Sequence, residues 1–176
     1  IGAPSAAIAM EEMYESGMQV AVRMGTVMSM QDDMLGHFMI PIAAMRREGT
    51  SQSYVDLSYP AVADVELVNV MNETVQQMGK RYLNGLNCTM DGFYSCMHDS
   101  KFSLECGRDM SKTFEEVKKL GVTGIDMESS CILTLGRLMG VKTCILTVVT
   151  VLENLKETLK GQDRVDAEDL LCRTAL

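Results

Sequence analysis

The sequence feature that most constrains the fold is the run VKTCILTVVTV, which occupies residues 141–151. Most of its side chains are β-branched, and its single charge lies next to its start. β-Branched residues favour strands, and an apolar run without polar alternation indicates a strand buried on both faces. The run therefore predicts an interior strand of a sheet that helices cover on both sides.

Helical and strand-like segments alternate along the rest of the chain, which is the pattern of an α/β protein. A length of 176 residues is enough for one domain with a real core, and we expect one domain over residues 1–176. The chain opens on a helix with no strand before it, which suggests the later part of a larger domain. The expected helices cover residues 4–16, 61–78, 113–121 and 165–175, with another ending at Gly140; the expected strands cover residues 18–24, 37–45, 82–90 and 141–151.

Three details of this pattern make specific predictions. The stretch GTVMSM, residues 25–30, is expected to turn after the first strand. Pro41 inside the second strand indicates an edge or a bulge. Thr113 and Glu116 have the spacing of a capping box, so the short helix should begin there and end at Gly121.

Composition excludes several classes of function. The formal net charge of −8 argues against a general nucleic-acid surface, which needs clustered Lys and Arg. No apolar run is long enough to span a bilayer, so we expect no membrane partner. The six cysteines show neither CxxC nor disulfide-scaffold spacing, which favours a reducing cytoplasm. The run CMHD, residues 96–99, lacks zinc-finger spacing, and we predict no metal site. The 16 methionines are expected to fill the core.

Three segments place polar groups where strands are expected to end, the usual location of ligands in an open α/β sheet. In the first, Arg23 precedes Gly25 and Thr26; the arginine either binds an oxyanion or is a solvated surface charge. In the second, Asp91 to Tyr94 form either a simple turn or an aromatic face against which a flat ring stacks.

The third segment is GIDMESSC, residues 124–131, which opens an apolar helix. Glu128 can accept hydrogen bonds from two adjacent hydroxyls, the arrangement that the 2′- and 3′-hydroxyls of a ribose present. A carboxylate that stabilises the positive end of the helix is an equally good reading of the residues alone.

Taken together, the segments resemble the nucleoside phosphorylase family, in particular its uridine phosphorylases. The resemblance rests on five pieces that occur in order and cover the chain to about Val151: IGAPSAAIAMEE, VRMGT, RREGTSQSYVDLSYPAVADVE, CTMDGFY and GIDMESS. It implies a three-layer α/β/α sandwich with a central mixed, twisted sheet. Family members also carry an earlier segment with a phosphate loop, which would precede the present start.

The resemblance also implies a reaction and a set of site residues. The reaction is reversible phosphorolysis of a nucleoside, most like uridine, with inorganic phosphate as co-substrate and no organic cofactor. Arg23 and Thr26 would bind phosphate and act in catalysis, and Met127 and Glu128 would hold the ribose. The implied base pocket contains Phe93, Asp126, Thr150 and Val151. A homodimer or larger homo-oligomer, with sites completed across subunits, is implied as well.

Departures from the family pattern concern the base site. After Gly25 and Thr26, the small residues usual in the family are replaced by Val27, Met28 and Ser29. The Gln and Arg that read uracil in uridine phosphorylases correspond to about Met97 and Asp99, which cannot donate to a carbonyl oxygen. Either loop residues are absent from the sequence, or base recognition is lost. A degenerate binding subunit, a nucleoside hydrolase and a purine-preferring phosphorylase are therefore the alternatives.

Overall fold

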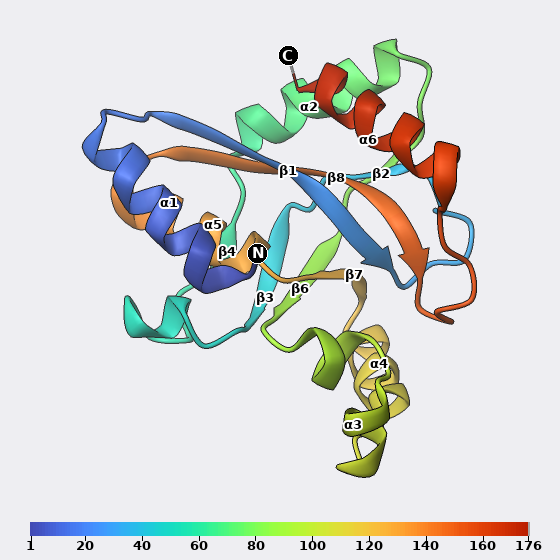
Figure 1. Cartoon of the computed structure of the whole chain (residues 1–176). Coiled ribbons are helices and arrows are strands. Elements are labelled where there is room, and N and C mark those ends of the chain that lie inside the picture. The colour runs from blue at the N-terminus through green and yellow to red at the C-terminus, as the bar shows by residue number, and fades with distance from the viewer. Residues whose placement is uncertain (176) are drawn as a thin grey trace.

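The computed structural model describes residues 1–175 and has one mixed sheet of eight strands (Figure 1). The sheet order is β4-β3-β6-β7-β1-β8-β2-β5. The strands are β1 (Val20–Ser29), β2 (Phe38–Met39), β3 (Ala43–Arg47), β4 (Ala61–Val62), β5 (Tyr82–Leu83), β6 (Leu86–Met90), β7 (Val122–Asp126) and β8 (Lys142–Leu152). The helices are α1 (Ala3–Glu15), α2 (Val65–Gln77), α3 (Lys101–Glu105), α4 (Met110–Lys119), α5 (Ser129–Met139) and α6 (Gly161–Thr174), with single helical turns η1 (Ser51–Ser53) and η2 (Phe93–Met97).

The β-branched run forms β8, an interior strand, as the sequence predicts. β8 pairs in parallel with β1 from Val20 opposite Lys142 to Ser29 opposite Leu152. β8 continues past Gly25, and β1 continues with it as far as Ser29. The expected turn at residues 25–30 is therefore wrong, because most of GTVMSM is strand. Arg23 and Thr26 therefore lie within β1 and not at its end. A bulge at Thr150 accommodates one extra residue of β8.

Helices cover both faces of the sheet, which confirms the α/β class. Figure 1 shows α2 and α6 together on one side of the long β1–β8 pair and α1 and α5 on the other. Cys131 and Cys144 are fully buried between these layers, as their apolar surroundings predict. Nine of the 16 methionines are buried, which confirms their role as core filler.

Several element boundaries differ from the expectations. Pro41 separates β2 from β3, so residues 37–45 form two strands with different partners. The second helix begins at Val65, after Asp64 accepts a hydrogen bond from the Leu67 amide. The expected capping box is wrong, because Asp109 caps α4 and Thr113 lies inside it. α5 ends at Gly140 in a left-handed conformation, as expected.

Candidate functional site

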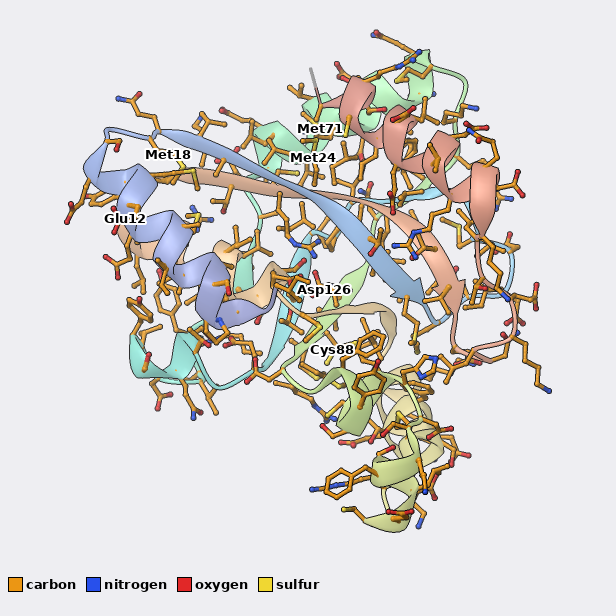
Figure 2. All side chains as sticks on the ribbon, viewed as in Figure 1. Glu12, Met18, Met24, Met71, Cys88 and Asp126 are labelled. Atoms are coloured by element: carbon orange, nitrogen blue, oxygen red, sulfur yellow. The ribbon has the colours of Figure 1, made fainter. Side chains whose placement is uncertain are left out.

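The direction of β7 determines which residues meet at the candidate site. β7 runs antiparallel to β1, with Ile125 opposite Met28. The chain that leaves Asp126 therefore returns along β1 toward Arg23 before α5 begins. This brings Glu128 against Arg23, 105 residues earlier in the sequence. Figure 2 shows Asp126 beside the first turn of α5, below β1.

Arg23 lies between two carboxylates. Its Nη2 donates to Glu128 Oε2, and its Nη1 is 3.3 Å from Asp126 Oδ2. The side chains of Arg23 and Glu128 are only 13% and 16% exposed, so their ion pair is shielded from water. A Cβ at position 25 would lie 3.0 Å from both Nη atoms of Arg23. Gly25 is thus the residue that lets the guanidinium lie flat against the strand.

Asp126 is the carboxylate that caps α5. It is buried and accepts hydrogen bonds from the amide and hydroxyl of Ser129, as well as a 2.8 Å bond from the Thr89 hydroxyl. Burial raises the pKa of Asp126, while the charge of Arg23 and the hydrogen bonds from Ser129 and Thr89 act in the opposite direction. The cap satisfies an otherwise free amide at the helix start.

Glu128 does not cap α5 with its side chain, although it occupies the N-cap position. Its Oε1 accepts a 2.6 Å hydrogen bond from the amide of Gly2, the residue at the start of α1. The geometry therefore does not favour a capping role for the Glu128 side chain. Each carboxylate oxygen has two acceptor positions, so Oε1 and Oε2 each retain one for a further donor.

The arrangement leaves one guanidinium donor without a hydrogen-bond partner and leaves carboxylate acceptor positions unused. Arg23 Nη1 is buried and makes no hydrogen bond within residues 1–175, because its approach to Asp126 lacks hydrogen-bond geometry. The Thr26 hydroxyl, three residues along β1, also makes no hydrogen bond in that part of the chain, and the alternation of the strand directs it to the face opposite Arg23. Two carboxylates lie against Arg23, so the site presents acceptors for a hydroxylated molecule beside a guanidinium with one unpaired N–H group.

Met127, predicted to hold the ribose, and two of the predicted base-pocket residues, Thr150 and Val151, lie in two different surroundings. Met127 and Val151 pack on one apolar cluster, whose buried members include Met28, Met97 and Phe114. Thr150 is buried at the β8 bulge, where its carbonyl accepts a 2.9 Å bond from the Leu159 amide. No hydrogen bond within the described residues connects these groups to Arg23.

Phe93 belongs to an exposed aromatic group on η2. Its ring stacks on His98 at a centroid distance of 5.6 Å and meets Tyr94 edge-on at 5.0 Å. The turn thus presents an aromatic face, and Asp91 is used locally to accept from the Gly49 amide. Met97, at the position of a uracil-reading residue, is buried in the core. His98 is the polar side chain that lies against Phe93.

The residues that support the site from behind were not predicted from the sequence. The Gly2 amide donates to Glu128, and the Thr89 hydroxyl donates to Asp126. The Ser130 amide donates a 2.8 Å hydrogen bond to Thr89 Oγ1. Backbone donors and single hydroxyls leave no pattern in a sequence. The one available signal was the polar pair Ser129–Ser130 inside an otherwise apolar helix.

Two cavities lie away from these residues. One, of about 440 Å³, lies between Lys80 and α6; the other, of about 230 Å³, lies around Arg137 at the end of α5. Neither is lined by a predicted site residue. Across residues 1–175, no group of three or more His, Cys, Asp or Glu side chains is placed to hold a metal ion. In the same span, no helix combines the length and apolar character needed to cross a membrane.

Comparison with known proteins identifies the family. Residues 1–172 match the model of the phosphorylase superfamily. The chain belongs to this superfamily. Curated relatives of this phosphorylase-superfamily chain include the uridine phosphorylase of Thermococcus kodakarensis, 32% identical over 150 residues, and that of Escherichia coli, 29% identical over 153 residues. These alignments cover 84% and 86% of the chain but 54% and 60% of the relatives, so the chain spans little more than half of their length.

Solved structures agree on the fold of the phosphorylase-superfamily chain. The uridine phosphorylase of Vibrio fischeri superposes with a TM-score of 0.85 at 30% identity and covers 99% of this chain and 69% of that one. The Plasmodium knowlesi homologue of the Plasmodium falciparum purine nucleoside phosphorylase superposes with a TM-score of 0.77 at 25% identity, covering 96% and 66%. The expected nucleoside phosphorylase fold, with its mixed sheet, is confirmed, and the chain corresponds to part of a longer relative.

Proposed function

We propose that the protein catalyses reversible phosphorolysis of a nucleoside, most readily uridine, to a free base and ribose 1-phosphate. The observation that carries the proposal is the shielded Arg23–Glu128 pair, whose unpaired guanidinium N–H and remaining carboxylate acceptor positions suit phosphate and ribose respectively. The reaction transfers a pentosyl group and belongs to pyrimidine salvage.

Arg23 and Thr26 are the phosphate ligands in this proposal. The guanidinium supplies a planar set of N–H donors, and the Thr26 hydroxyl adds one from the same strand. Gly25 keeps the guanidinium close to the strand, which fixes the direction of its free Nη1. The start of α1, whose Gly2 amide already points at Glu128, adds positive potential for an anion.

Glu128 and Met127 are the ribose ligands. The remaining acceptor positions on Oε1 and Oε2 take the 2′- and 3′-hydroxyls, while Met127 provides an apolar wall packed on the core. With the ribose held, a phosphate oxygen attacks C1′ as the C1′–N bond breaks. The electron pair of the C1′–N bond leaves with the base, which then takes up a proton. Such catalysis depends on orientation and on charge placed where it develops, and needs no covalent nucleophile.

Phe93 would stack on the nucleoside, with Asp126, Thr150 and Val151 completing the surroundings of the base. A second candidate function is a degenerate family member that binds ligand or an active copy without efficient turnover. The burial of Met97 favours it, because this residue offers no donor to a departing base. A missing transition-state donor commonly costs about 10²- to 10³-fold in rate. A purine-preferring phosphorylase is the alternative within the enzymes.

The proposal includes a homodimer or larger homo-oligomer in the cytoplasm. All six cysteines are free, which suits a reducing compartment. Ile8 on α1 is 66% exposed, and the hydroxyl of Tyr54, just after η1, donates to Glu11 of α1, so α1 and the η1 loop are joined. Light scattering coupled to size exclusion would measure the mass; a monomer at micromolar concentration would contradict this part.

The deciding experiment is a phosphate-dependence assay with uridine. Purified full chain should release uracil and ribose 1-phosphate only when phosphate is present. Release of uracil without phosphate would mean hydrolysis, and no turnover of any nucleoside by folded protein would support the degenerate member. The same assay with inosine tests for a purine preference, which faster turnover of inosine than of uridine would show.

Glu128→Ala tests the ribose role directly. Loss of hydrogen bonds to a charged acceptor should raise the nucleoside KM by at least about tenfold, with little change in melting temperature. Glu128→Gln, which keeps the shape and loses the charge, is the matched control and should be intermediate. A large loss of stability with unchanged kinetics would instead assign Glu128 a structural role at α5.

A further inference from the structure

The interior behind the site contains a second carboxylate that the proposed reaction does not use. Glu48 follows β3 and is only 3% exposed. Within residues 1–175 it forms no ion pair, because the neighbouring Arg46 and Arg47 are engaged elsewhere. Burying a carboxylate without an ion-pair partner costs free energy, so the hydrogen bonds to Glu48 must offset that cost.

Glu48 accepts hydrogen bonds from two different parts of the chain. The Ser51 amide donates a 2.8 Å hydrogen bond to Glu48, and the Ser51 hydroxyl donates another; both lie within the loop after β3. The third donor is the hydroxyl of Ser130, at 3.0 Å, which lies in the first turn of α5 and 82 residues away. Glu48 therefore connects the loop after β3 to the start of α5.

Ser130 passes this connection on to the candidate site. Its amide donates 2.8 Å to Thr89 Oγ1, and the Thr89 hydroxyl donates 2.8 Å to Asp126. Asp126 in turn caps α5 and faces Arg23. Ser130 is two residues beyond Glu128, so any rotation of the first turn of α5 moves the Glu128 carboxylate.

We propose that Glu48, acting through Ser130, is a positioning residue that fixes the first turn of α5 and thereby aims Glu128 at the ribose. The proposal rests on the proposed function of Glu128. A charged acceptor is suited to this task, because its hydrogen bonds are stronger than those between neutral groups. Within the described residues, the Ser130 hydroxyl donates the only hydrogen bond that α5 makes to Glu48.

The test compares Ser130→Ala with Ser51→Ala in the full chain. Both changes remove one fully buried hydroxyl donor from the same Glu48 carboxylate. Only Ser130→Ala breaks the link to α5, while it keeps the amide bond to Thr89. We expect Ser130→Ala to raise the nucleoside KM about tenfold and to leave the phosphate KM within about twofold. Ser51→Ala should lower the melting temperature with both KM values unchanged.

Calorimetric titration with ribose 1-phosphate gives a second readout that needs no turnover. Ser130→Ala should weaken binding by about the same factor as the nucleoside KM. Equal kinetic effects of the two variants, or none in Ser130→Ala, would overturn the positioning role while leaving the proposed function intact. A wild-type chain that neither turns over nor binds ribose 1-phosphate would overturn the proposed function, and this inference with it.

Discussion

Gly25 shows how one missing side chain shapes the candidate site at the scale of a residue. Arg23 and Gly25 point to the same face of β1, and the guanidinium occupies the space that a side chain at position 25 would need. A long cation held flat in this way loses little further freedom when it meets an anion. The position of Arg23 thus depends on its neighbour as much as on its two carboxylates.

Gly25→Ala should therefore act on phosphate. The new methyl group, 3.0 Å from the guanidinium, requires Arg23 to shift by a few tenths of an ångström from its place against the strand. We expect the phosphate KM to rise about tenfold, equivalent to about 1.4 kcal/mol of lost binding, with the nucleoside KM less affected. Steady-state kinetics with each substrate varied in turn would measure this. Met24→Ala is the control, because that half-exposed side chain points away from Arg23; an equal effect there would contradict the explanation.

At the scale of elements, the start of α4 differs from the start that the sequence predicts. The spacing of Thr113 and Glu116 satisfied a capping box, yet α4 starts three residues earlier, where Asp109 accepts from the Ser111 amide at 3.1 Å. Met110 and Phe114 are buried and face the same apolar cluster, so packing extends the helix back to Asp109. Tertiary contacts here outweigh a local motif.

This start of α4 predicts different costs for two similar changes. Asp109→Ala should lower the free energy of unfolding measurably through loss of the cap. Thr113→Ala, inside the helix, should change it by less than about 0.5 kcal/mol. Urea denaturation would measure both. A larger cost for Thr113→Ala would restore the capping box and move the start of α4.

Charge links the site to the stability of the whole molecule. Asp126 has a raised pKa because it is buried, so the native state binds this proton more tightly than the unfolded chain. Its contribution to stability is present below the ordinary pKa of 3.8 and is lost as pH rises through the higher native value. Perturbed pKa values of this kind are concentrated at functional sites.

We expect the free energy of unfolding of the wild type, relative to Asp126→Asn, to fall as pH rises above 3.8. Urea denaturation of both proteins from pH 4 to pH 8 would show the slope. The exposed Asp33 gives the contrast, because the hydrogen bond and charge of Arg81 lower its pKa; the same difference for Asp33→Asn should be flat or rise slightly. A rising difference for Asp126 would contradict the assigned direction.

At this scale the sequence supported the α/β class, the β8 strand, the α5 helix and the family resemblance, because each depends on local patterns several residues long. The network behind the site was out of reach. Glu48, Thr89 and Ser130 come from three separate segments, and only the sheet order brings them together. Likewise, the sequence could not show that β7 runs antiparallel to β1, on which the meeting of Arg23 and Glu128 depends.

That antiparallel pairing also limits how the chain can vary in length. Between Ile125, still in register with β1, and Ser129, the first residue of α5, three residues carry both carboxylates to Arg23. One inserted residue there would turn Glu128 to the opposite face and separate the α5 cap from its amide. The segment between η2 and α4 projects away from the sheet and has no such constraint (Figure 1). Insertions and deletions among homologous chains should therefore collect around residues 98–109 and be absent from residues 125–129.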